Sequence, residues 1–121
     1  MRDMSCTLSP EELSYLRRVL EAAKKLSTET TFEEVLLETD NEYVAEAERD
    51  RVEAEWDALI AKLERGVCPT AREKQMIRNA LDVFCTRKYR DMVKRMYPKL
   101  RMRWTRQDEQ FTCAREWSPI G

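Results

Sequence analysis

The sequence predicts an all-α protein, and three observations support that fold class. Apolar residues recur at three- and four-residue spacing along most of the chain, which is the period of an amphipathic helix. Capping-box patterns precede these runs at Ser9–Glu12, Thr31–Glu34 and Thr70–Glu73. No segment of four or more residues combines alternating apolar and polar residues with β-branched enrichment, and no Asn-Gly or Asp-Gly hairpin turn occurs. Because short connectors make neighbouring helices antiparallel, we expect a four- to five-helix antiparallel bundle with a partly extended basic C-terminal tail.

The first helix has the clearest start signal in the chain. Ser9 can serve as the N-cap, Pro10 suits the first helical position, and Glu12 completes the capping box. Apolar residues at helical spacing continue to about Leu26. The polar run Ser27–Thr30 is typical of a connector, so we expect this helix to end there.

The capping box at Thr31 predicts the start of a second helix. The following run includes residues that favour turns and caps, which predicts a break near Asp40, although one uninterrupted helix over 31–65 is an alternative. Gly66 suits the left-handed position after a helix, and Pro69 prevents the helix from continuing. We therefore expect the helical pattern of this region to end just before Gly66.

The capping box at Thr70 predicts another helix. Its apolar phase continues to Tyr97, so the helix either reaches Tyr97 or pauses at Thr86, which would then cap a fifth helix, and Pro98 ends it in both cases. The remaining segment begins as extended chain, and Thr105 is a plausible cap for a short last helix. Apolar residues of that last helix would be Phe111, Ala114 and Trp117. The expected organisation is a helical domain over 1–97 and a basic, aromatic tail over 98–121 that packs on the bundle or extends from it.

Length and composition indicate one folded domain without the usual catalytic groups. The chain has 121 residues, of which 42% are hydrophobic and 37% charged, a balance typical of a folded chain with a charged surface. It contains no histidine, and therefore lacks the commonest general base and the commonest zinc ligand. With only two glycines it has no glycine-rich phosphate-binding loop. We expect no enzymatic activity, no cofactor and no metal.

Four widely spaced cysteines and the absence of a long apolar run inform the expected compartment. Cys6, Cys68, Cys85 and Cys113 form no Cys-x-x-Cys pair. No window approaches the roughly eighteen uncharged apolar residues that a membrane-spanning helix needs. We expect an intracellular, cytoplasmic protein, with a nuclear location as an alternative. Its cysteines are expected to be thiols, and Cys68 and Cys85 to be small core residues.

The formal net charge of −1 conceals two oppositely charged segments. Residues 28–57 contain twelve acidic residues against two arginines, a local charge of −10, and residues 87–106 contain nine basic residues against Asp91, a local charge of +8. The acidic residues are Glu29, Glu33, Glu34, Glu38, Asp40, Glu42, Glu46, Glu48, Asp50, Glu53, Glu55 and Asp57. Without histidine partners these carboxylates do not resemble a helical di-metal centre, so a solvated acidic face is the simpler interpretation. The third interpretation is that this face docks a basic partner or the chain's own basic helix.

The basic segment is the strongest candidate for a functional surface. The simplest interpretation is that its apolar residues face the core and its cations face solvent or pair with the acidic helices. Two functional interpretations compete with it. Arginine and aromatic residues together favour docking of an acidic or helical protein partner, whereas the same residues could bind RNA through phosphate contacts and base stacking. The isoelectric point of about 5.7 counts against RNA, and strand-like alternation around Trp104 counts against membrane association.

The expected function is therefore that of a non-catalytic protein–protein interaction module, an adaptor or a subunit of a larger assembly. Nucleic-acid (RNA) binding through 87–106 is the alternative, and homo-oligomerisation through complementary charges stays open. The expected partner-binding residues are Arg90, Lys94, Arg95, Tyr97, Lys99, Arg101, Arg103, Trp104 and Arg106. Tyr97 and Trp104 are the expected anchors because aromatic residues dominate interface energetics.

Overall fold

A computed structural model of the chain describes residues 5–85 and 87–109 and confirms an all-α protein. The helices are α1 (Pro10–Thr39), α2 (Glu42–Glu64), α3 (Ala71–Phe84), α4 (Arg90–Lys99) and the short α5 (Arg106–Glu109), with a 3₁₀ turn, η1 (Arg87–Tyr89), before α4. The described residues form no strand, and their only β-type pairing is an isolated bridge between Ser5 and Val67. The expected features at Thr86, Phe111, Cys113, Ala114 and Trp117 lie outside the described residues.

Helix α1 begins where the sequence predicts and continues much further than expected. The Ser9 hydroxyl accepts a hydrogen bond from the Glu12 backbone N–H (3.2 Å), and Glu12 Oε1 accepts one from the Ser9 N–H (2.8 Å). The predicted end near Leu26 is wrong, because α1 runs through Ser27–Thr30 to Thr39. Neither glycine nor proline interrupts that stretch, and the Thr28 hydroxyl donates to the Lys25 carbonyl within the helix (3.0 Å). A polar run without a helix breaker is therefore insufficient to end this helix.

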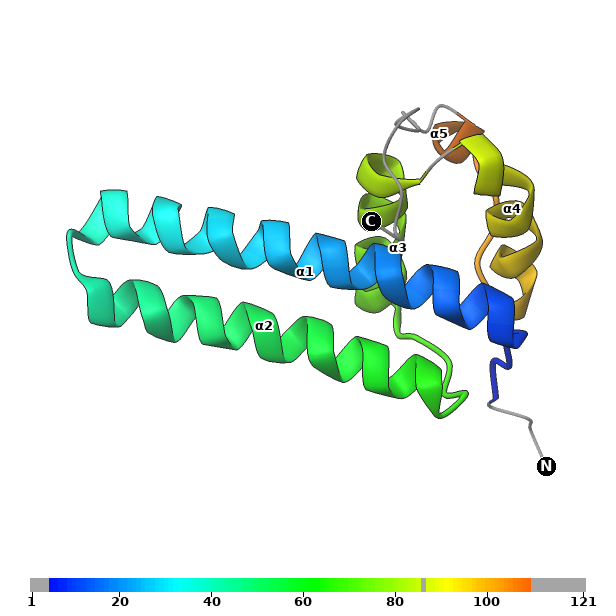
Figure 1. Cartoon of the computed structure of the whole chain (residues 1–121), viewed down its shortest axis with the longest axis horizontal. Coiled ribbons are helices and arrows are strands. Elements are labelled where there is room, and N and C mark those ends of the chain that lie inside the picture. Colours follow the sequence, from blue (N-terminus) through cyan, green and yellow to red (C-terminus); the bar gives the residue numbers. More distant parts are fainter. Residues whose placement is uncertain (1–4, 86, 110–121) are drawn as a thin grey trace.

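The predicted break near Asp40 is confirmed. Asp40 caps α1 in the left-handed conformation (φ 52°), which short polar side chains tolerate better than most. The side chain of Asn41 then accepts hydrogen bonds from the backbone N–H groups of Tyr43 (3.0 Å) and Val44 (3.3 Å) and starts α2. The chain thus reverses over two residues, and α2 returns antiparallel to α1 (Figure 1).

The end of α2 also follows the sequence signal. Gly66 adopts φ 73°, its N–H donates to the Leu63 carbonyl, and the Val67 N–H donates to the Lys62 carbonyl (2.9 Å). This pair of hydrogen bonds is a Schellman motif, which requires a residue that tolerates positive φ. The bridge to Ser5 follows immediately and brings the N-terminal segment against this turn.

A disulfide bond between Cys6 and Cys68 closes this end of the molecule. The two Cα atoms lie 4.9 Å apart, although the cysteines are 62 positions apart in the chain. The expectation that these two cysteines are thiols, with Cys68 a free core residue, is therefore wrong. Their spacing carried no sign of the pairing, which arises because the Gly66 turn places Cys68 beside the segment that leads into α1. Cys85 is a buried free thiol, as expected.

Helix α3 starts with the predicted capping box at Thr70 and ends at Phe84. The helical pattern therefore pauses before α4, as one of the two alternatives predicts. The N-cap of α4 is Tyr89, whose side chain makes no capping hydrogen bond. Pro98 lies inside the last turn of α4, which ends at Lys99 and not at Tyr97.

The helices form a long hairpin that is covered near one end by the remaining elements. Helices α1 and α2 lie antiparallel, as expected, whereas α3 and α4 run across them in Figure 1, so the regular antiparallel bundle is not confirmed. Leu16, Leu20, Leu59 and Ile77 are fully or almost fully buried where the hairpin meets α3. Leu100 and Met102, from the predicted tail, belong to the same core. The segment 100–105, which we call the strap, is thus packed on the helices and leads back along α4 to α5 (Figure 1).

Replacing the disulfide cysteines in Cys6→Ala/Cys68→Ala should lower the free energy of unfolding by about 2–5 kcal/mol, because the cross-link restricts the unfolded chain. The measurement is urea denaturation with and without reductant. Reductant should destabilise the wild-type protein and leave the double variant unchanged. Cys85→Ala is the control and should keep the sensitivity to reductant. If the urea midpoint of the wild-type protein were the same with and without reductant, this would contradict the presence of the disulfide bond.

The capping box of α3 should make stability depend on pH. Burial of Glu73 opposes its ionisation, but hydrogen bonds from Lys62 (2.7 Å) and the Thr70 N–H (2.8 Å) outweigh this and lower the pKa of Glu73 below its ordinary value. A lowered folded-state pKa stabilises the protein above the ordinary value of 4.5, and this stabilisation disappears as the pH falls below it. Glu73→Gln should therefore cost about 0.5–2 kcal/mol near neutral pH and much less near pH ~3. Glu53→Gln, at an exposed position, is the control. An equal pH dependence of the stability of both variants would contradict the lowered pKa of Glu73.

Candidate interaction surface

The structure distributes the predicted partner-binding residues over α4, the strap and α5. Val93, Met96 and Tyr97 are buried on one side of α4, so its outer side carries the cations. We call the following set the cationic face: Arg90, Lys94, Arg95, Lys99, Arg101, Arg103 and Arg106. All of them are exposed except Arg90, which is half-buried. The structure therefore brings the predicted cations of α4, the strap and α5 onto neighbouring elements.

Tyr97 is not available as an interface anchor. Its side chain is fully buried, because its position on α4 shares the apolar face with Val93, Met96 and Leu100. The phenol donates a hydrogen bond to Asp108 Oδ1 (3.1 Å). Burial and the adjacent Asp108 charge raise the pKa of Tyr97 far above its ordinary value, so the phenol keeps its proton. The expectation that Tyr97 anchors an interface is therefore wrong, whereas the apolar phase that continues to Tyr97 agrees with its burial.

Asp108 connects α3, α4 and the strap. Its fully buried carboxylate accepts hydrogen bonds from Tyr97, from the Thr105 N–H (2.8 Å) and from the Thr105 hydroxyl (2.9 Å). Arg78 of α3 adds an ion pair, with its Nε 3.6 Å from Oδ1, and its terminal nitrogen donates to the Arg103 carbonyl (2.9 Å). These contacts attach the strap to both α3 and α4 and fix the backbone that carries Arg103.

Trp104, the other predicted anchor, is half-buried and engaged within the chain. Its ring lies 4.9 Å from the Tyr97 ring, and the Lys94 ammonium lies 5.6 Å from its centroid. Its indole N–H donates to Glu109 Oε1 (2.7 Å). This hydrogen bond, together with the one from Lys94, lowers the pKa of Glu109. The indole N–H and part of the ring of Trp104 therefore make contacts within the chain, and these contacts hold α5 against α4.

Ion pairs reduce the charge of the cationic face unevenly. Arg90 (2.9 Å) and Lys94 (3.4 Å) share Glu109, and Lys99 pairs with the buried Glu12 at the start of α1 (2.7 Å). By contrast, the side chains of Arg95, Arg103 and Arg106 form no ion pair among residues 5–85 and 87–109. These three guanidinium groups are therefore exposed and, within the part of the chain that the structure describes, not neutralised by a carboxylate.

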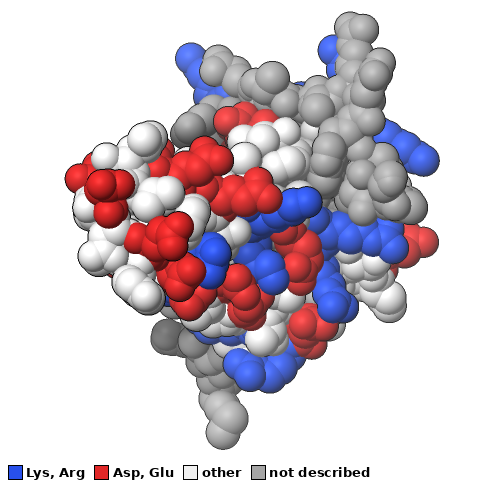
Figure 2. All heavy atoms as spheres, turned by 60° about the vertical axis from the view of Figure 1, so that its left-hand side comes forward, with Lys and Arg blue, Asp and Glu red and all other residues white. Residues whose placement is uncertain are grey.

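The acidic segment occupies the other end of the molecule. Residues 28–57, which we call the acidic arm, form the part of the α1–α2 hairpin that extends past α3 (Figure 1). Viewed toward this end, carboxylates cover much of the surface, with few cations among them near the tip (Figure 2). Large apolar side chains are also exposed near the tip, Leu37 by 87%, Tyr43 by 84% and Val44 by 41%. The sequence predicted the charge of this surface but not its projection as an arm.

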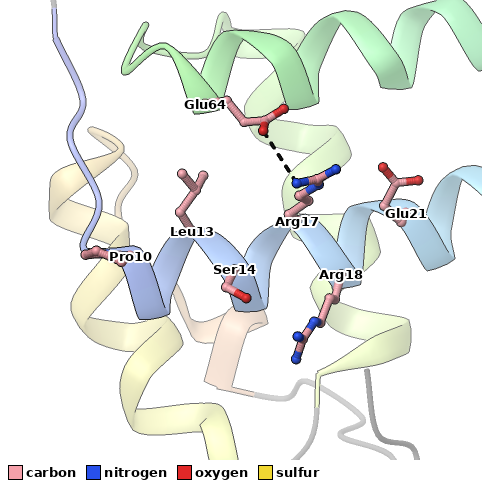
Figure 3. A pocket seen from close by; sticks show the side chains of 7 residues that line it. All are labelled: Pro10, Leu13, Ser14, Arg17, Arg18, Glu21 and Glu64. Atoms are coloured by element: carbon pink, nitrogen blue, oxygen red, sulfur yellow. Dashed lines mark ion pairs between the residues drawn. The ribbon is translucent and has the colours of Figure 1, made fainter. Parts of the chain in front are cut away.

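An open groove of about 590 Å³ runs beside the first turns of α1 (Figure 3). Arg17 reaches across it toward Glu64 of α2 (3.6 Å), and Arg18 points to the other side of α1. The side chains of Glu21 and Glu64 are each 43% exposed. Because these carboxylates are solvated and accompanied by arginines, the groove offers a mixed-charge surface without a buried acid–base pair.

Two further findings concern metals and membranes. Within the described residues, no group of three or more His, Cys, Asp or Glu side chains is placed to hold a metal ion. None of the helices in that part of the chain combines the length and the apolar composition needed to cross a membrane.

Sequence reasoning missed the residues that organise this surface. The Thr105 capping signal pointed to a helix start, and α5 does follow it, but nothing in the local sequence showed that Asp108 would also receive Tyr97 and Arg78. Arg78 lies on α3, 30 positions before Asp108, and spacing alone does not connect them. Long-range polar contacts of this kind depend on how α3 and α4 cross α1.

Comparisons with models of known protein families, with curated protein sequences and with solved structures found no match for this chain. The function is therefore argued from the geometry and charge of the surfaces described above.

Removing the Asp108 carboxylate in Asp108→Ala should lower the free energy of unfolding by about 3–5 kcal/mol, because it leaves the Arg78 charge without its buried partner. Tyr97→Phe removes one hydrogen bond to that carboxylate and should cost about 1–3 kcal/mol. Urea denaturation measures both effects. Glu109→Gln, at an exposed neighbouring position, is the control and should stay within about 1 kcal/mol of the wild-type protein. Equal stability of Asp108→Ala and Glu109→Gln would contradict the role of Asp108.

Proposed function

We propose that this chain is a non-catalytic protein-interaction module that binds an acidic partner through its cationic face. The observation that carries the proposal is the state of Arg95, Arg103 and Arg106, which are exposed and lack ion-pair partners in the described residues. Arginine is enriched in protein interfaces and pairs with carboxylates in a bidentate geometry. A set of unpaired arginines suits a partner that supplies carboxylates at fixed positions.

The attachment of the strap supports this proposal. The Asp108 contacts and the Arg78–Arg103 hydrogen bond restrict the backbone of the strap before any partner arrives. Binding by a pre-organised surface loses less conformational entropy than binding by a flexible tail. The cationic face is therefore better suited to specific docking than the extended tail expected from the sequence.

RNA binding is the alternative, and the aromatic residues make it less favourable. Sequence-tolerant binding of single strands relies on aromatic rings that are open to stacking by bases. Tyr97 is fully buried, and Trp104 is half-buried against Tyr97 and Lys94. The cations are available for phosphates, but the stacking surfaces expected from the sequence are largely covered.

The disulfide bond changes the proposed setting. Disulfide bonds persist in oxidising compartments and are rare in the cytosol. With Cys6 and Cys68 bonded, we place the proposed interaction in an oxidising compartment instead of the cytoplasm expected from the sequence.

The proposal is tested by titrating the labelled protein with a Glu-rich amphipathic peptide and, separately, with a single-stranded RNA, each at about 50 and 200 mM salt. The peptide should bind saturably. Arg95→Glu/Arg103→Glu should weaken that binding by about tenfold or more, because two carboxylates that repel the acidic peptide replace two guanidinium groups that attract it.

Lys25→Glu/Arg65→Glu is the matched control, since it makes the same change of charge at exposed positions outside the cationic face. It should change the affinity by no more than about twofold, the scale of weak surface electrostatics. Saturable RNA binding with a steep salt dependence, combined with no peptide binding, would establish the alternative and overturn the proposal.

A further inference from the structure

A second pocket lies beside the groove of Figure 3, between α1 and the start of α4. It has a volume of about 480 Å³, which is within the range of pockets that hold ligands. Pro10, Ser14 and Arg18 line both hollows and form the ridge between them. This second hollow, which we call the α1–α4 pocket, contains no residue of the cationic face in its lining.

The helical repeat explains why two distant segments supply the lining. On α1, Tyr15 and Arg18 follow Glu11 by four and seven residues, so all three lie on one side of the helix. On the other wall, Tyr89 is the N-cap of α4, and Met92 follows it by three residues. Each wall therefore contributes a tyrosine, and α4 adds a methionine.

Contacts between α1 and α4 hold the two walls in place. The Tyr15 ring stacks on the Tyr89 ring, with the centroids 4.3 Å apart and 23° between the planes. Further along α4, Lys99 pairs with Glu12 of α1 (2.7 Å). Tyr15 is buried, whereas Tyr89 and Met92 are half-buried. The pocket thus has a fixed aromatic and thioether floor that is partly open to solvent.

Cations outnumber carboxylates around this floor. Arg18 lines the pocket, the Lys88 ammonium lies 5.6 Å from the centroid of the Tyr89 ring, and Arg95 lies one turn further along α4. All three are exposed, and none of them forms an ion pair with another described residue. The lining itself includes one carboxylate, that of Glu11. The surroundings therefore favour an occupant that carries negative charge next to its apolar part.

Arg95 and Lys99 connect the α1–α4 pocket with the cationic face. They follow Met92 by three and seven residues and therefore lie on its side of α4. The exposed arginines of the cationic face supply charge, but interfaces gain most of their affinity from a few large side chains that are buried in pockets. The α1–α4 pocket is such a place at the edge of the cationic face.

We propose that the α1–α4 pocket takes an aromatic side chain of the acidic partner, flanked by carboxylates in the partner's own sequence. This rests on the proposed function of the cationic face and specifies the chemistry of its partner. The aromatic ring packs against Tyr15, Tyr89 and Met92, since contacts of a ring with other rings and with sulfur are favourable. The flanking carboxylates pair with Arg18 and Arg95.

The test uses two labelled Glu-rich peptides that are identical except for a central Phe in one and a central Ala in the other. Each is titrated against the full chain by fluorescence anisotropy. The Phe peptide should bind about tenfold more tightly or better, because only its ring fills the pocket.

Met92→Lys should abolish this preference for Phe and leave the Ala peptide bound at least as tightly. The new side chain occupies the pocket while it adds positive charge, so a purely electrostatic site would not lose affinity. Met76→Lys is the matched control, because Met76 is also half-buried but lies on α3 and does not line the pocket. It should keep the preference for Phe.

Charge reversal at exposed positions tests the flank of the pocket without altering buried residues. Arg18→Glu should weaken binding of the Phe peptide by about fivefold or more, because a repulsive carboxylate replaces an attractive guanidinium group. Arg17→Glu makes the same change one residue earlier, where the side chain reaches toward Glu64 in the groove of Figure 3. This control should change the affinity by no more than about twofold.

The outcomes separate this proposal from that for the cationic face. Equal affinities of the Phe and Ala peptides for the wild-type protein would overturn the pocket as the aromatic site. If both peptides still lost affinity in Arg95→Glu/Arg103→Glu, the cationic face would stand as the binding surface. Binding of neither peptide would overturn both proposals. Displacement of the Phe peptide by free phenylpropionate as effectively as by unlabelled Phe peptide would overturn a protein segment as the occupant, because a free aromatic acid would then account for the site.

Discussion

The buried carboxylate of Asp108 is the interaction on which the arrangement of the cationic face depends. It joins Tyr97 of α4, Thr105 of the strap and Arg78 of α3, which approach it from different directions. A buried charge is tolerated only when hydrogen bonds and an opposite charge replace the water it has lost, and all of these partners are present. Because the strap is held in this way, Leu100 and Met102 reach the core while Arg101 and Arg103 remain exposed.

The fold separates the two charged segments of the sequence into two exposed regions. The acidic arm lies at the free end of the α1–α2 hairpin, whereas the cationic face lies on α4 and the strap, near the covered end. Pairs such as Lys24–Asp57 (2.9 Å) and Arg72–Glu55 (2.6 Å) connect the base of the arm to its neighbours. Nearer the tip of the arm, carboxylates cover much of the surface with few cations among them (Figure 2). The described residues thus carry two exposed regions of opposite charge.

Local signals in the sequence predicted the parts of the structure that local chemistry determines. The capping boxes at Ser9 and Thr70 and the turn at Gly66 occur as expected, because each depends on hydrogen bonds among residues within a few positions. The continuation of α1 past Leu26 was not predictable with the same rules, since tertiary packing outweighs the weak turn preference of Ser and Thr.

The long-range contacts were beyond prediction from spacing. The pairing of Cys6 with Cys68 and the meeting of Arg78, Tyr97 and Asp108 require the relative placement of helices that the sequence does not encode locally. The candidate cations were identified correctly as surface residues, whereas Tyr97 was not, because an aromatic residue among cations fits an interface anchor and a core residue equally well. Its burial follows from the phase it shares with Val93 and Leu100.

Amide hydrogen exchange in the strap tests most directly whether the cationic face is pre-organised. The Met102 N–H donates to the Tyr97 carbonyl (2.8 Å), and the Thr105 N–H donates to Asp108 (2.8 Å). If the strap is part of the folded core, both amides should exchange orders of magnitude more slowly than in an unstructured peptide, with protection approaching that of the amides in α3. Exchange of these two amides at the rate of an unstructured peptide, while α3 stays protected, would contradict the account.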